Sequence, residues 1–154
     1  MVNWGIKAIQ SDEGLDVIDL FEAFVEKHPD LEMKELIAYY KVQGFLAKDK
    51  TEIDYLYDTT AIALSEIYLE YRETGEVVFG NEPLVIRSFT AMKEDVQFLR
   101  TLIDDIIQER PDEDGEREYA DLHKETPGWP AYIRDFFERL NSEYIKLGGR
   151  EAKK

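Results

Sequence analysis

Carboxylates are the side chains that have both the numbers and the spacing to do chemistry in this sequence. The chain contains 34 Asp and Glu residues, 2 His and no Cys. Carboxylate oxygens bind divalent cations and also act as general acids and bases. Asp12 and Asp16 share one face of a first expected helix, and Glu32 and Glu35 lie one turn apart in a second. These four are the candidate metal ligands, although the sequence does not show whether they meet in space.

Two known metal-binding patterns fail when they are compared with the sequence in full. The acidic loop that begins at Asp112 has Arg117 where an EF-hand needs glycine, and His123 where it needs a bidentate Glu. Helical nucleotide pyrophosphohydrolases carry Glu-x-x-Glu followed by Glu-x-x-Asp. Glu32 and Glu35 supply the first half of that pattern, and the second half is missing. We therefore expect no cofactor and assign no catalytic residue.

Other nucleophiles and bases have little support. The chain has no thiol for catalysis, metal binding or disulfide formation. His28 precedes a proline, and His123 lies in a polar segment, so we interpret both as surface or capping residues. No glycine-rich loop that could hold a phosphate is present.

The carboxylates of the first helix allow two interpretations. Asp12, Asp16 and Asp19 repel one another on one helical face, and a cation or a basic partner would relieve that repulsion. The same face lies opposite the apolar residues, where a solvated stripe is also expected. The tyrosines are similarly ambiguous, because Tyr39 and Tyr55 fit either the core or a partner-binding surface.

The net charge limits the classes of partner. Its formal value is −15, which repels nucleic acid and anionic membranes and favours a basic protein as partner. The first 25 residues lack the features of a signal peptide, and no apolar run approaches the ~18 residues of a membrane span. We therefore expect a cytoplasmic protein.

The elements that must position these residues are helical almost throughout. Apolar periodicity predicts a mainly α, single compact domain of five or six helices around a central helix near residues 52–74. A short hairpin near residues 76–87 is the only β-structure expected. The domain is expected to cover residues 1–148, with a frayed tail at 149–154. With their caps and stops, the expected helices cover residues 11–28, 30–44, 51–75, 90–110, a short 116–124, and 130–148 from Pro130 onward.

The N-terminal segment combines architectural residues with a recognisable motif. We expect Trp4, which Gly5 follows, to anchor the segment, Ser11 to cap the first helix, and Gly14 to lie within the apolar face, where Trp4 could approach closely. The stretch WGIKAIQSDEGLD, from Trp4 to Asp16, resembles the opening of a family of small bacterial proteins classed only as a domain of unknown function. DTTAIALSE at 58–66 and SFTA at 88–91 also resemble such sequences. The resemblance implies a bacterial, cytoplasmic, non-catalytic protein and brings no activity or cofactor.

Two functions from different classes follow from these observations. The first is a non-enzymatic interaction protein, such as an immunity-type inhibitor or nucleic-acid mimic that blocks a basic partner. The second is a divalent-metal-dependent enzyme that uses carboxylates from several helices.

Overall fold

The part of the chain that the structure describes consists of five helices and two short strand pairs. The computed structural model describes residues 12–46, 55–79, 82–110 and 127–148. The helices are α1 (Asp12–Lys27), α2 (Met33–Val42), α3 (Tyr55–Thr74), α4 (Lys93–Ile107) and α6 (Trp129–Lys146). The strands are β1 (Asp30–Glu32), β2 (Val78–Phe79), β3 (Glu82–Pro83) and β4 (Ser88–Thr90). The prediction of a compact, mainly α domain is confirmed.

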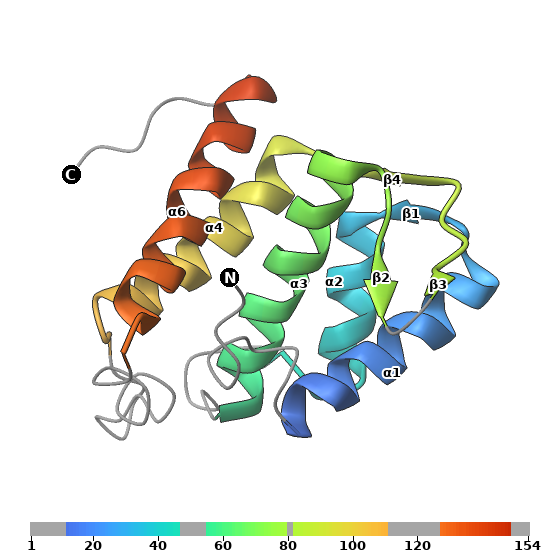
Figure 1. Cartoon of the computed structure of the whole chain (residues 1–154), viewed down its shortest axis with the longest axis horizontal. Helices are drawn as coiled ribbons and strands as arrows, with labels where there is room; N and C mark the ends of the chain where they lie inside the picture. The colour runs from blue at the N-terminus through green and yellow to red at the C-terminus, as the bar shows by residue number, and fades with distance from the viewer. Residues whose placement is uncertain (1–11, 47–54, 80–81, 111–126, 149–154) are drawn as a thin grey trace.

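Helix α3 lies at the centre of the fold, as the apolar periodicity of residues 52–74 predicts. Figure 1 shows α4 and α6 on one side of it and α1 and α2 on the other. Every residue from Tyr57 to Ser65 is buried, so this part of α3 contributes to the core around its whole circumference. Two of the buried hydroxyls are satisfied locally, because Thr60 donates to the carbonyl of Leu56 at 2.7 Å and Ser65 to that of Ala61 at 2.8 Å.

Helix α1 buries one face against α3 and exposes the other. Val17 and Phe21 are fully buried on the inner face, and Gly14 is buried with them. The hydroxyl of Tyr40 in α2 donates to the carbonyl of Val17 at 2.6 Å, which attaches α2 to the N-terminal half of α1. The expected contact between Gly14 and Trp4 lies outside the described residues, as do the predicted roles of Gly5 and Ser11.

The second helix begins at Met33, not at Asp30 as the sequence predicted. Residues 30–32 instead form β1, which pairs in parallel with β4. Contacts with a distant segment cause the difference, since the carbonyl of Pro29 accepts a hydrogen bond from the backbone N–H of Arg87 at 2.7 Å. Leu31, buried between two exposed neighbours, gives this stretch the alternation of a strand.

The hairpin predicted near residues 76–87 is present, and a further strand, β4, follows it before the next helix. Strands β2 and β3 pair antiparallel, with Val78 opposite Pro83. The fourth helix begins at Lys93, where the sequence predicted a start near Thr90, because residues 88–90 form β4. The backbone N–H of Met92 donates to the Asp95 carboxylate at 3.0 Å, which fixes the first turn of α4.

The C-terminal helix packs along α4 and completes the described core. It begins at Trp129, directly before the predicted first residue Pro130, and it buries Ile133, Phe136 and Leu140. The predicted short helix at 116–124 and the predicted tail at 149–154 lie outside the described residues. The domain bounds of 1–148 stay a prediction.

Candidate functional site

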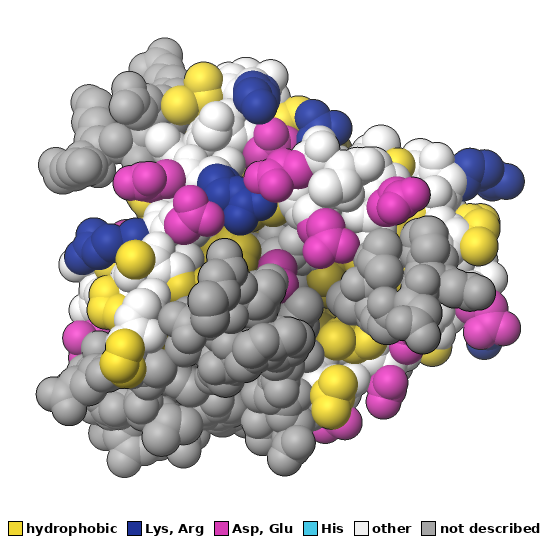
Figure 2. All heavy atoms as spheres, viewed as in Figure 1, with side chains coloured by type: hydrophobic (Ala, Val, Ile, Leu, Met, Phe, Trp, Pro, Cys, Tyr) yellow, Lys and Arg dark blue, Asp and Glu magenta, His cyan; other side chains and the backbone are white. Residues whose placement is uncertain are grey.

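The exposed side of α1 is the most acidic described surface that a single helix presents. The helix contains six acidic residues and one basic residue, so a third of the chain's net charge of −15 lies in 16 of its 154 residues. Asp16, Asp19, Glu22 and Glu26 are all exposed, and their spacing of three or four residues places them on one side of the helix. We call these four residues the α1 acidic face. Figure 2 shows Asp and Glu side chains along the lower right edge, where α1 runs in Figure 1.

No member of the α1 acidic face forms an ion pair with a residue that the structure describes. Like charges at these spacings repel one another and destabilise the helix by a few tenths of a kcal/mol per pair, ~0.2–0.5. Leu15, with 53% of its surface exposed, lies on the same side of α1. The face therefore offers a charged surface with one apolar contact. Asp12 begins the helix, and its side chain lies outside the described residues.

Tyr39, one of the two predicted partner-surface tyrosines, belongs to a small aromatic cluster between α1 and α2. The centre of its ring lies 4.8 Å from the centre of the Phe24 ring. The His28 ring stacks on the same phenylalanine, with 4.3 Å between the ring centres. Tyr39 is half-buried and His28 is exposed, so part of the cluster remains accessible. Tyr55 begins α3, and its side chain lies outside the described residues.

Glu32 and Glu35 do come together at the start of α2. A hydrogen bond with the Glu35 carboxyl group and the negative charge of that group raise the pKa of Glu32 above its ordinary value of 4.5. Asp16 lies near the N-terminal end of α1. Its neighbour Val17 contacts Tyr40, near the C-terminal end of α2, whereas Glu32 and Glu35 lie at the N-terminal end of α2. Among the described residues, no group of three or more Asp, Glu or His side chains could hold a metal ion. The structure thus unites one pair of the four predicted ligands and separates that pair from Asp16.

Asp30, which lies in β1 together with Glu32, has a basic partner. The guanidinium of Arg87 shares its Nε–H between the two oxygens of the Asp30 carboxylate, at 2.9 and 3.0 Å, and also donates from Nη2. The hydroxyl of Ser88 donates to the same carboxylate at 3.0 Å. These hydrogen bonds, led by those from Arg87, lower the pKa of Asp30 from 3.8 to about 2. The interaction joins β1 to β4, so its role is architectural.

The most buried acidic side chain of the C-terminal helix is also paired. Glu143 is 7% exposed and accepts hydrogen bonds from Arg72 Nε at 2.9 Å and from the Tyr68 hydroxyl at 3.3 Å. Lys146 lies 3.5 Å from its second oxygen. Burial, with a smaller contribution from the Glu143 charge, raises the pKa of Tyr68 to about 12, so the phenol keeps its proton. This network links α3 to α6 and engages the Glu143 carboxylate in structural contacts.

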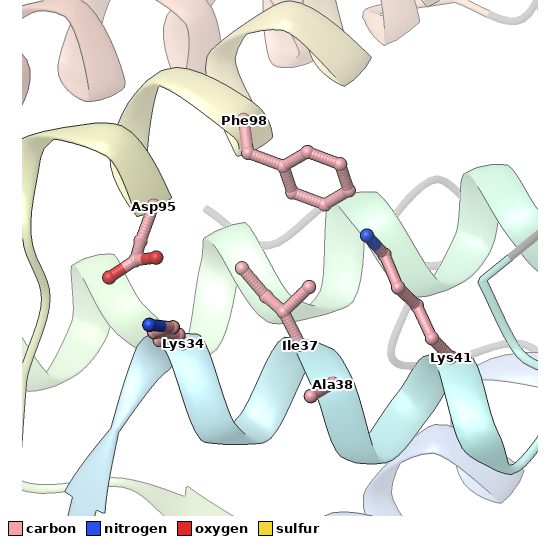
Figure 3. A pocket seen from close by; sticks show the side chains of 6 residues that line it. All are labelled: Lys34, Ile37, Ala38, Lys41, Asp95 and Phe98. Atoms are coloured by element: carbon pink, nitrogen blue, oxygen red, sulfur yellow. The ribbon is translucent and has the colours of Figure 1, made fainter. Parts of the chain in front are cut away.

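A pocket of about 300 Å³ lies between α2 and α4, and sequence reasoning missed it. Figure 3 shows its six lining side chains, which are Lys34, Ile37, Ala38, Lys41, Asp95 and Phe98. The signal that could have indicated it is the pair of lysines seven residues apart on one face of an expected helix, in a chain with few basic residues. The aromatic partner on α4 could not be paired with them from the sequence.

Comparisons with known proteins give the chain no relative. No family model, no curated protein and no solved structure matches it. The resemblance of the segment from Trp4 to Asp16 to a family of unknown function stays a prediction. In the described part of the chain, the helices are too short or too polar to cross a membrane.

Proposed function

We propose that this protein is a non-enzymatic interaction protein, and that its α1 acidic face binds a basic partner protein. The partner class that fits best is a basic toxin or nuclease, which an immunity-type inhibitor of bacterial origin would block in the cytoplasm. The observation that carries the proposal is that Asp16, Asp19, Glu22 and Glu26 are exposed together without ion-pair partners among the described residues.

Electrostatics explains why such a face would suit an inhibitor. Complementary charge increases the rate of encounter between two proteins, and the increase depends strongly on ionic strength. Charges that already have intramolecular partners contribute less, because those partners cancel their field. The exposed Leu15 adds apolar contact area on the same side of α1, and the half-buried Tyr39 adds aromatic area beside Phe24 of that helix.

Charge removal at two matched sets of positions tests the proposal. The triple variant Asp19→Asn, Glu22→Gln, Glu26→Gln removes three charges from the α1 acidic face. The control variant Glu76→Gln, Glu94→Gln, Glu138→Gln removes three exposed charges elsewhere and has the same net charge.

The partner is first captured on the immobilised protein at low salt, then identified and purified. Calorimetry then measures the affinity of each variant for this partner. We expect the α1 variant to bind at least about tenfold more weakly than the control, and binding of the wild type to weaken in about 1 M NaCl. Equal affinities for the two variants, or recovery of no basic protein at low salt, would exclude the α1 acidic face as the binding site.

A metal-dependent enzyme is the second candidate, and the contact between Glu32 and Glu35 is the observation that favours it. A divalent cation held at 100 times its dissociation constant would add ~2.7 kcal/mol to the free energy of unfolding. Our proposal predicts no change in melting temperature with millimolar Mg²⁺, Mn²⁺ or Ca²⁺. A rise that disappears in Glu32→Gln would support the metal site instead.

A further inference from the structure

We propose that the pocket between α2 and α4 binds a small amphipathic anion, consisting of a short apolar body with a single carboxylate. This inference does not depend on the α1 acidic face, because that face is negatively charged and lies on another helix. It rests on three properties of the pocket, namely its apolar floor, its two lysines without an ion pair to a described residue, and its volume.

The floor of the pocket is apolar and comes from both helices. Ile37 of α2 points toward Phe98 of α4 (Figure 3), and Ala38 also lines the pocket. Ile37 is buried, whereas Phe98 keeps part of its ring exposed. An apolar ligand body placed over these side chains would remove more of that surface from water, which is favourable by roughly 25 cal/mol per Å².

The charge at the rim is positive on the α2 side. Lys34 and Lys41 lie two helical turns apart on the same face of α2, and both line the pocket. Neither lysine forms an ion pair with a described residue, in a chain that has 34 acidic and 19 basic residues. Lys41 instead places its Nζ 4.8 Å from the centre of the Phe98 ring. Two ammonium groups that have no ion pair with a described residue, beside one cavity, point to an anionic ligand, although the charge of Lys34 also acts on Glu32.

Asp95 sets the direction in which the ligand lies. Its carboxylate lies at the Lys34 end of the pocket, as Figure 3 shows, and it accepts the backbone N–H of Met92. A ligand carboxylate at that end would meet a fixed negative charge, so the favourable position is at the Lys41 end. The apolar body then extends over Ile37 toward Lys34. This arrangement makes Lys41 more important for affinity than Lys34.

The volume limits the size of the ligand. A cavity of about 300 Å³ is at the lower end of the range of small-molecule sites, which is roughly 300–1,000 Å³. It fits a chain of about eight carbons or one substituted ring, and it is too small for a peptide helix, which needs an extended groove. The ligand is thus a small molecule such as a medium-chain or aromatic carboxylate.

Titration of the full-length, ¹⁵N-labelled protein with octanoate tests the proposal. We expect amide shifts to concentrate on α2 and α4 around the pocket residues, with saturable binding. Octanol and octylammonium, which have the same apolar body with no charge or with a positive charge, should bind at least about tenfold more weakly. Equal binding of octanol would overturn the proposal, because the pocket would then be a general apolar site.

Three variants and one control separate the parts of the pocket. Lys41→Gln should weaken octanoate binding about tenfold and Lys34→Gln only a few-fold. Ala38→Trp fills the pocket from an exposed helical position, so it should abolish binding while the fold is retained. The control Lys93→Gln removes an exposed lysine at another site and should bind as the wild type does. Octanoate affinity that Lys41→Gln or Ala38→Trp leaves unchanged would overturn the proposal, as would shifts located elsewhere in the protein.

Discussion

Carboxylates lie in opposite environments on the outer side of α1 and at the junction between α3 and α6. On α1, exposed carboxylates such as Asp19 and Glu22 face solvent without ion-pair partners among the described residues. At the junction, Glu143 pairs with Arg72, while Arg139 of α6 reaches back to Glu73 of α3 at 2.5 Å. The upper part of Figure 2, over α3, α4 and α6, shows Lys and Arg side chains lying among the Asp and Glu side chains.

This difference teaches that acidity has two separate roles in the molecule. Where a carboxylate has an arginine partner across a helix interface, it contributes to the fold and its field is largely cancelled. Where several carboxylates repel one another on one helix, they cost stability, and natural proteins often retain such a cost at sites of function. Stability measurements should therefore respond in opposite directions when charge is removed from the two regions.

The largest effect is expected at the paired junction. Replacing Arg72 by Met keeps much of the side-chain volume and leaves the Glu143 carboxylate buried with only Lys146 and the Tyr68 hydroxyl beside it. The free energy of unfolding should fall by about 1–3 kcal/mol, less than for a fully buried pair because Arg72 is half exposed. Urea denaturation followed by circular dichroism measures the change. A midpoint equal to that of the wild type would show that the junction does not stabilise the fold.

A smaller effect is expected where α1 is attached to the core. Tyr40→Phe removes the buried hydroxyl that donates to the Val17 carbonyl at 2.6 Å, and leaves that acceptor with one partner fewer. The free energy of unfolding should fall by about 0.5–1.5 kcal/mol. Hydrogen exchange should become faster mainly in α1 and α2, since the lost bond joins these two helices. Uniformly faster exchange in all helices would contradict this local role.

Removing charge from α1 should have a small effect of the opposite sign. The variant Asp19→Asn, Glu22→Gln, Glu26→Gln removes the three repulsive neighbouring pairs of the α1 acidic face, so the free energy of unfolding should rise by about 0.6–1.5 kcal/mol at low salt. In about 1 M NaCl the gain should vanish, because salt already screens the repulsion. The variant Glu76→Gln, Glu94→Gln, Glu138→Gln is the control for net charge alone. A loss of stability in the α1 variant would mean that these carboxylates have structural partners.

Local periodicity was sufficient to predict most of the fold. The apolar stripes of α1, α3 and α6 each span at least four turns, and repetition over that length defines a buried face without knowledge of its neighbours. The same reasoning placed the carboxylates of α1 on its exposed side and α3 at the centre.

What the sequence could not predict depends on contacts between distant segments. The pairing of β1 with β4 requires Asp30 to meet Arg87, and three-residue strands carry too little periodicity to be recognised. The pocket likewise requires Lys41 and Phe98 to be brought together from two helices. Of the three predicted metal ligands whose side chains the structure describes, Glu32 and Glu35 come together, and they are also neighbours in sequence.

The comparison between paired and unpaired carboxylates recurs within β1, where it should appear as opposite pH dependences with little effect on total stability. The pKa of Asp30 is lowered from 3.8 to about 2 by hydrogen bonds from Arg87, so its contribution to stability is present above pH 3.8 and is lost as the pH falls toward 2. The pKa of Glu32 is raised above 4.5 by the Glu35 carboxyl group, so its contribution is present below pH 4.5 and is lost as the pH rises through the raised value.

Side-chain carboxyl NMR titration should give two well-separated curves for these residues. Arg87→Ala should move only the Asp30 curve, upward toward its ordinary position, with the Ser88 hydrogen bond retained, and Glu35→Gln should lower only the Glu32 curve. If either substitution moved both curves together, the two residues would share one electrostatic environment, and pairing by individual partners would not explain their difference.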